Sequence, residues 1–525
     1  MYRQKSKIIN LLKHSIWFHI SVLSVVFFSM YYPHTLILNE NIETIAAFEI
    51  DASDMIKTTL KHIETFNTGT EYKTFRYGWT YFTFSTLLIK PIQLIDNLFQ
   101  FNFDSSYYIF LIRNVFFLFS FLSLLALYFL LVKLSGSSII ALALSSFYLF
   151  PSLRLILFVD LKPETVGLFF LFLSQIFLFY FLEAKKSMRN TLYIAGVVSL
   201  ILSVLSKQSF LFTALPVFSL YLWYDWKSQR VRLSTYFMSN HFSKLFLTTL
   251  IIGFFMILIV VPALFLHTDK MIKGMTYLFS AHTEGTNINL SGSSLFKAWF
   301  STIRNNPLLV VTGVLWPISV FLTIKQNSKL KIYYLVHLLC FPLILFILTS
   351  NATRFIILYY LTPLYSYILI TLLIPILSLV SVPRFLLNKF FRILLVIFGV
   401  MIISSSLFAV HQSLKIREGY KSSDIMILRN YIEENIPKGS KIAISDSILL
   451  PSKTDYDSCH WWSTCTNLKS VENFQPEFLI FINNRTFNGV HPNSYLSFRE
   501  YIKNENFSNI YSLGKFVIYS KSDDE

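Results

Sequence analysis

Three acidic residues lie close together a short distance after the first apolar run of the chain. Glu49, Asp51 and Asp54 fall within six positions of the segment "AAFEIDASDMIK". If this segment is helical, Asp51 and Asp54 share one face at i, i+3 spacing. A carboxylate at a membrane surface can act as a general base towards a hydroxyl group. The same pattern also suits a solvated start of an interfacial helix, because acids favour the positive end of the helix dipole.

A second acidic loop is predicted further along the chain. The segment "RLILFVDLKPETV" presents Asp160, Lys162 and Glu164 between two apolar runs. If both runs cross the membrane, this loop and the first acidic segment lie at the same surface. Two loops with carboxylates that face one cavity suit acid–base chemistry, and they equally suit a cation site.

The elements that must position these acids are membrane spans. The chain is 54% hydrophobic and only 14% charged, against about 25% charged residues in a soluble domain. Runs such as 114–132 and 245–266 match the roughly 20 apolar residues that cross a bilayer. The first run, 15–38, is longer than the core of a signal peptide and lacks a small-residue cleavage site, so we interpret it as a retained span.

Short basic connectors predict the orientation of these spans. The net charge of +16 is carried largely by the basic start of the chain and by the connectors 183–190, 224–244, 325–331 and 383–392. Because short basic loops stay on the cytoplasmic side, we expect these segments in the cytoplasm. Their position between spans argues against nucleic-acid binding. An even number of crossings must then separate successive connectors, so residues 76–95 are predicted to form an external interfacial or re-entrant helix. The prediction is a membrane all-α protein, a polytopic bundle of about 11 transmembrane helices, with an intracellular N-terminus and these spans: 15–38, 107–133, 136–153, 164–182, 191–206, 209–224, 245–266, 307–324, 330–349, 355–376 and 391–410.

The last part of the chain has a different pattern. An amphipathic helix with Ile425, Leu428 and Ile432 on one face is followed by short β-rich segments such as "KIAIS" and "EFLIFINN". We therefore predict two domains, a transmembrane domain over 1–410, with its first external loop at 39–106, and a small extracytoplasmic α/β domain over 411–525.

Three cysteines leave one pair outside the predicted spans. Cys459 and Cys465 lie in "CHWWSTC", where a disulfide would close a short loop and add about 2 kcal/mol of stability. A metal site with His460 as a third ligand is the alternative, but no fourth ligand lies at a useful spacing. We therefore list no metal-binding residue.

The order of several motifs resembles the GT-C superfamily of integral-membrane glycosyltransferases, of the protein mannosyltransferase and aminoarabinose transferase type. Asp51 matches the first acid of the motif that follows the first span, although Ala52 stands where a glutamate is usual. The segment "RYGWTYF" (76–82) resembles a second element on a surface helix, but it lacks the usual proline. The resemblance covers most of residues 15–410, and its signal is the order and common sidedness of the motifs. Further matches are Asp160 in the second external loop, Lys207 at an external turn and Arg354 at the start of a late span, where Phe355 follows it.

The resemblance implies transfer of a sugar from a polyprenyl-phosphate donor to a lipid, glycan or protein acceptor at the outer face of a membrane. Asp51, Glu49, Asp54 and Asp160 are the candidate catalytic acids, and which of them is the base stays open. Several cationic and aromatic residues have implied binding roles. No cofactor is certain, although a divalent cation between Asp51 and Asp160 is compatible with the pattern. The implied location is the bacterial inner membrane, among membrane lipids. The resemblance implies that Lys207 and Arg354 bind the donor phosphate and that Arg76, Tyr77 and Lys162 bind the substrate.

Two other functions compete with this interpretation. A polytopic transporter would favour charged or broken helices at mid-membrane depth, whereas here the charges gather at the ends of the spans. An envelope polysaccharide polymerase or ligase is also many-spanning and externally active. Such proteins usually lack a folded C-terminal α/β domain, so the tail distinguishes them.

Overall fold

The structure is a computed structural model of the 525-residue chain. It forms two compact units, the first made of residues 1–36 and 55–411 and the second of residues 37–54 and 412–525. Apart from isolated residues between these segments, the described ranges are 2–37, 50–65, 78–149, 161–261, 307–326, 330–350, 362–380, 410–415, 418–445, 449–452, 454–460, 468–482, 500–514 and 516–521.

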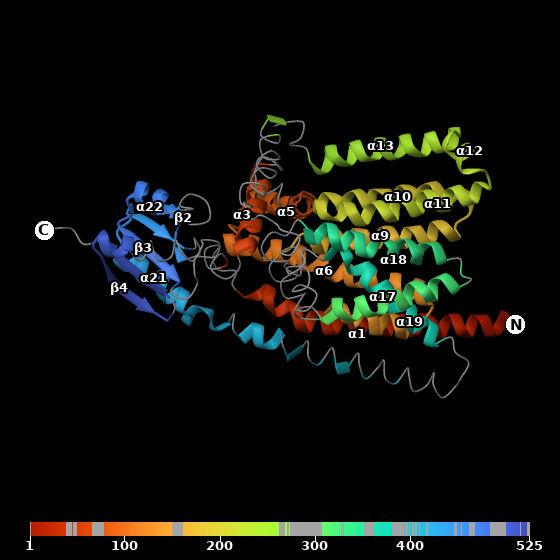
Figure 1. The fold of residues 1–525 in the computed structure, drawn as a ribbon, viewed down its shortest axis with the longest axis horizontal. Coiled ribbons are helices and arrows are strands. Elements are labelled where there is room, and N and C mark those ends of the chain that lie inside the picture. The colour runs from red at the N-terminus through yellow and green to blue at the C-terminus, as the bar shows by residue number, and fades with distance from the viewer. Residues whose placement is uncertain are drawn as a thin grey trace. The chain divides into compact units, whose positions relative to one another are not determined.

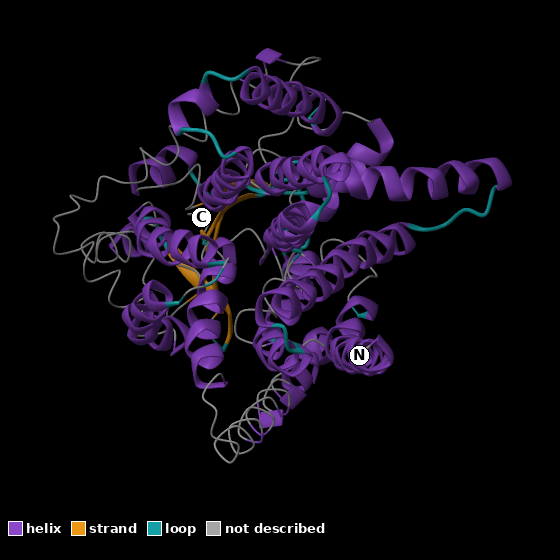
Figure 2. Ribbon diagram, turned by 90° about the vertical axis from the view of Figure 1, so that its right-hand side faces the viewer, coloured by secondary structure: helices purple, strands orange, loops and turns teal. Residues whose placement is uncertain are grey.

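The first unit is a bundle of helices that run along a common direction (Figure 1), and Figure 2 views many of them nearly end-on. By length and composition, five helical stretches in the described part are able to cross a membrane, and three shorter apolar helices accompany them. The predicted total of about 11 spans stays a prediction. The five stretches lie in α1 (Tyr2–Leu36), α6 (Ser105–Ser135), α9 (Glu164–Glu183), α10 (Lys186–Ser206) and α13 (Asn240–Val260).

The other helices of this unit are shorter or less apolar. The expected span 136–153 is described as far as Leu149, and there it is a nine-residue helix followed by a 3-10 turn. At 1.5 Å per residue such a helix reaches only about half of the bilayer core. The remaining elements are α3 (Ile50–Thr65), α5 (Thr80–Phe99), α7 (Ser138–Ser146), α11 (Leu211–Gln229), α12 (Leu233–Phe237), α17 (Pro307–Lys325), α18 (Lys331–Ser350) and α19 (Tyr365–Val380).

Local sequence explains where several of these helices begin and end. Asp104 caps α6, and its side chain accepts a hydrogen bond from the Tyr107 N–H at 3.0 Å. Gly136 ends the same helix in the left-handed region, with φ of 64°, which costs glycine little because it has no Cβ. The helix α5 begins at Thr80 and continues through Pro91 to Phe99, so the Lys90-Pro91 step does not interrupt it.

The core of the bundle forms around α9, which packs against α6 and α10. Both its apolar and its polar side chains contribute. The rings of Phe119 and Phe170 lie 6.1 Å apart between α6 and α9. The Ser203 hydroxyl donates to the Gly167 carbonyl at 2.8 Å and so joins α10 to α9. In the apolar interior of a bundle such hydrogen bonds align the helices in addition to their packing.

The C-terminal part of the second unit is a five-stranded mixed sheet with the order β2-β1-β3-β5-β4. The helices α21 (Asp424–Asn435) and α22 (Leu468–Phe474) pack against its opposite faces. The period of two along β1 explains this, because Ile442 and Ile444 face α21 while Ala443 faces α22. β1 pairs in parallel with β2 and β3, and β5 pairs antiparallel with β3 and β4. The strands are β1 (Lys441–Ile444), β2 (Asp457–His460), β3 (Phe478–Ile482), β4 (Phe507–Leu513) and β5 (Phe516–Lys521).

The strand β2 was not expected from the sequence. It contains Cys459, which is disulfide-bonded, and His460, whose Nε2 lies 3.1 Å from the Ser458 hydroxyl. The disulfide favours the first of the two interpretations of "CHWWSTC" over the metal site.

Candidate functional site

A buried ion pair joins two helix ends in the first unit. Lys207 follows the last residue of α10, and its ammonium group binds Oε1 of Glu164, the first residue of α9. The Glu164 side chain is completely buried and that of Lys207 is 13% exposed. A lysine that only snorkels extends its ammonium group into water or headgroups. Lys207 instead turns towards a buried carboxylate, which indicates a built polar site at this end of the bundle.

The start of α5 is held against the same helix end by hydrogen bonds to backbone carbonyls. The Trp79 N–H donates to the Leu205 carbonyl at 2.8 Å, and the Thr80 hydroxyl donates to the Leu202 carbonyl at 2.9 Å. The Thr83 hydroxyl reaches the last residue of α13, Val260, at 2.8 Å. The N-terminal part of α5, which begins inside the "RYGWTYF" motif, is therefore fixed beside Lys207.

Gly78 permits this close approach. Its φ is +80°, and a Cβ built on it would lie 2.0 Å from the Ser206 carbonyl oxygen. We predict that Gly78→Ala lowers the free energy of unfolding by at least about 2 kcal/mol, because backbone strain and a steric clash add together. Thermal unfolding in detergent measures this loss.

Gly136 supplies a matched control for that prediction. It also has a positive φ, of +64°, but nothing lies within 4 Å of the Cβ that alanine would add. Gly136→Ala therefore introduces the strain without the clash. Equal destabilisation by the two substitutions would show that the contact between Gly78 and Ser206 contributes nothing.

The second half of α3 packs on α5. The Lys90 ammonium donates to the Ile63 carbonyl at 2.7 Å, and the rings of His62 and Phe82 lie 5.1 Å apart. Tyr81, on the same turn of α5, is fully buried, and burial raises the pKa of its hydroxyl. Tyr81 therefore stays protonated and donates to the Ile112 carbonyl.

The predicted site residues fall into three groups. Lys207 and Lys162 are described, and Lys162 is 4% exposed in the turn before α9. Asp51 and Asp54 lie on the first turns of α3, where their spacing places them on one face of the helix. The described residues do not include Glu49, Arg76, Tyr77, Asp160 and Arg354.

Sequence reasoning did not assign a role to Glu164. It counted this residue only as one acid of the second loop, because no local sequence pattern predicts that the start of α9 contacts the end of α10. A usable signal was nevertheless present. A proline followed by an acid at the start of an apolar run predicts a helix N-terminus, and the lysine follows the next apolar run after a short basic connector.

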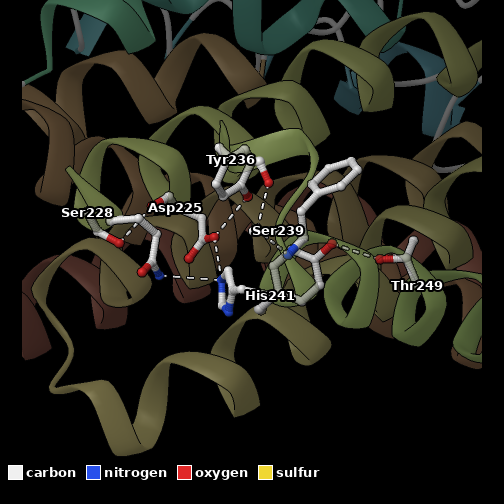
Figure 3. A network of polar contacts seen from close by, with 9 residues as sticks. Asp225, Ser228, Tyr236, Ser239, His241 and Thr249 are labelled. Atoms are coloured by element: carbon white, nitrogen blue, oxygen red, sulfur yellow. Dashed lines mark hydrogen bonds and ion pairs between the residues drawn. The ribbon is translucent and has the colours of Figure 1, made fainter. Parts of the chain in front are cut away.

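A second polar cluster lies near the other end of α11 (Figure 3). Tyr236 and His241 point towards Asp225, with Tyr236 Oη and His241 Nε2 at 2.9 and 2.8 Å from its Oδ2. Burial, together with the neighbouring Asp225, raises the pKa of Tyr236, so its hydroxyl remains a donor. By the helix rise Asp225 is about 20 Å along α11 from the helix start that follows Lys207, so this cluster joins α11, α12 and α13 and is separate from the candidate site.

Metal ligands are not gathered in the described part of the chain. There, no group of three or more His, Cys, Asp or Glu side chains is arranged to hold a metal ion. The side chains of Asp51 and Asp160, the pair considered for a divalent cation, are outside the described residues.

The chain is similar to known proteins in structure but not in sequence. No protein-family profile and no curated protein sequence matches the chain. Two crystal structures of ArnT from Cupriavidus metallidurans are similar over almost their entire length. The one bound to undecaprenyl phosphate has a TM-score of 0.56 and 12% identity, and covers 97% of this chain and 98% of its own. The one in the apo state has a TM-score of 0.53 and 11% identity, and covers 98% of both chains. The chain therefore has the fold of ArnT, which confirms at the level of fold the resemblance to the GT-C membrane glycosyltransferases.

Proposed function

We propose that this protein is a glycosyltransferase that takes a sugar from a polyprenyl-phosphate donor and transfers it to an acceptor at the extracytoplasmic face of a membrane. The observation that carries the proposal is the buried pair of Lys207 and Glu164, at a helix end where α5, α9, α10 and α13 meet. The ArnT fold supports it, since one of the two similar structures is bound to undecaprenyl phosphate.

The reaction makes three demands that this place in the fold can meet. The isoprenoid tail of the donor must stay in lipid, its phosphate must be held by cations, and the acceptor must approach from water. Lys207 and Arg354 would bind the phosphate, because fixed cations offset charge on phosphate oxygens. Arg76, Tyr77 and Lys162 would contact the sugar or the acceptor.

The transfer itself exchanges one C–O bond for another. The acceptor hydroxyl attacks the anomeric carbon, and the bond from that carbon to the phosphate oxygen breaks with its electron pair on the phosphate. The hydroxyl proton passes to a general base, for which Asp51 is our first candidate and Glu49, Asp54 and Asp160 are the alternatives. The products are the glycosylated acceptor and a polyprenyl phosphate.

The direct test is transfer by the wild-type protein in membranes. A panel of radiolabelled polyprenyl-phosphate sugars is supplied to membrane extracts that contain or lack the protein. We expect label to enter an acceptor from at least one donor only when the protein is present. Accumulation of an intact donor inside vesicles, with no transfer, would instead favour the transporter.

The positive-inside pattern supports an orientation with the start of the chain in the cytoplasm and the C-terminal α/β domain outside. The disulfide at Cys459 agrees with an oxidising compartment. We predict that a membrane-impermeant thiol reagent applied from outside labels Ser53→Cys, on α3, but not Ser228→Cys, near the end of α11. Strong labelling of Ser228→Cys in sealed cells would contradict this orientation.

A further inference from the structure

Glu164 differs from an ordinary structural acid in how its carboxylate is satisfied. Its side chain is completely buried, and buried polar groups nearly always have hydrogen-bond partners. One oxygen binds Lys207, but Oε2 has no hydrogen-bond partner among the residues that the structure describes. Within the described part of the chain, the candidate phosphate-binding lysine therefore holds this carboxylate through one oxygen alone.

Glu164 lies on a helix turn that is held by backbone hydrogen bonds and close packing. Backbone N–H groups of Thr165 and Gly167 donate to the carbonyls of Lys162 and Pro163, which fixes the first turn of α9. A Cβ added to Gly167 would lie 2.5 Å from the ring of Phe210, so little space exists for this turn to move. A carboxylate at the start of a helix is also stabilised by the helix dipole. Glu164 can therefore stay in place while Lys207 contacts a second anion.

The two forms of the lipid phosphate differ in charge. The donor is a phosphodiester with one negative charge, whereas the polyprenyl phosphate that leaves is a monoester, which carries about 1.5 to 2 negative charges at neutral pH because its second pKa is about 6. A lysine alone would hold the product more tightly than the donor. A fixed negative charge beside that lysine opposes the product more strongly than the donor.

We propose that Glu164 acts as an internal counter-anion that weakens the binding of the polyprenyl phosphate product relative to the donor and so favours product release. This inference rests on the proposed role of Lys207 in phosphate binding. Glu164 is a positioning and specificity-determining residue in this scheme, and it takes no part in the bond exchange.

The test compares two lipid probes of different charge. Binding of a short-chain polyprenyl phosphate and of its methyl phosphodiester is measured for the full-length protein in detergent. Wild type should bind the monoester no more tightly than the diester. Glu164→Gln should bind the monoester about tenfold more tightly, which corresponds to 1.4 kcal/mol, and should strengthen diester binding less. A merely structural role predicts weaker or unchanged binding of both probes, and that result would overturn the inference.

Two further variants separate this inference from the proposed function. Glu164→Asp keeps the charge and should bind both probes within about threefold of wild type, a change of roughly 0.7 kcal/mol. Adding Lys207→Met to Glu164→Gln should abolish the gain in monoester binding that Glu164→Gln brings. If the double variant binds the monoester as tightly as Glu164→Gln alone, Lys207 does not hold the phosphate and the proposed function loses its main support. If it loses binding but Glu164→Gln brings no gain, only the role of Glu164 is wrong.

The wild-type protein provides a measurement that needs no variant. Should Glu164→Gln fail to fold, the ratio of the two affinities in wild type decides the question. A preference for the monoester would contradict the inference, and equal affinities or a preference for the diester would support it.

Discussion

Replacing Asp51 with asparagine is expected to reduce sugar transfer by about 10² to 10⁴-fold while the protein stays folded. Asparagine keeps the size of the side chain but cannot accept the proton of the acceptor hydroxyl. Asp51 lies on the first turn of α3, which continues into the packed contact with α5, so the substitution leaves that contact intact. Radiolabel transfer and the unfolding temperature, measured on the same preparation, separate loss of chemistry from loss of structure.

The neighbouring acids are the matched controls for this experiment. Asp54 lies on the same face of α3 as Asp51, so Asp54→Asn changes the same charge one turn away. Glu49→Gln and Asp160→Asn cover the remaining candidates for the base. Full transfer by Asp51→Asn, with a large loss in one of the other three variants, would move the general base to that residue.

Replacing Lys207 with methionine is expected to lower the free energy of unfolding by roughly 3 to 5 kcal/mol. The substitution leaves the carboxylate of Glu164 buried without a counter-charge, and its side chain is completely buried. Adding Glu164→Gln removes that charge, so the double variant should recover most of the stability. Replacing a buried ion pair by neutral residues of similar size is often close to neutral. Thermal unfolding of the wild type, the two single variants and the double variant gives the coupling free energy between Lys207 and Glu164.

Transfer activity of the same variants then distinguishes two roles of Lys207. If the lysine binds the donor phosphate, the stable double variant remains inactive, because no cation is left at this position. If the pair only stabilises the bundle, the double variant regains transfer with its stability. Asp225→Asn is a control at the other polar cluster, where Tyr236 and His241 lose a charged acceptor. It should lower stability while the folded fraction keeps its transfer rate.

Hydropathy was sufficient to predict the class of fold and several helix boundaries. The short turn between α10 and α11 was expected, and the structure has only Lys207 and one 3-10 turn there. The amphipathic helix of the tail is also present as α21, with Leu428 and Ile432 buried. These features depend on residues close in sequence, because burial of an apolar face follows directly from the periodicity of that face.

Elements whose form depends on distant partners were predicted less well. The run after Gly136 is apolar enough to suggest a span, but α7 ends after nine residues. The strand β2 carries the polar sequence Asp457–His460, and it exists because β1 pairs with it in parallel. Neither outcome is encoded by local hydropathy, since each depends on which segment lies alongside.

The candidate site divides in the same way between sequence and tertiary structure. The sequence by itself determined that the protein belongs in a membrane, that acidic residues lie next to the apolar runs and that Lys207 lies at a turn between two apolar runs. Only the tertiary structure decided that Lys207 meets Glu164, 43 positions away, and that Gly78 packs against Ser206. The physical reason is that a charge in an apolar bundle must find its partner wherever the packing of the helices brings one, and helix packing is set by contacts between segments far apart in the chain.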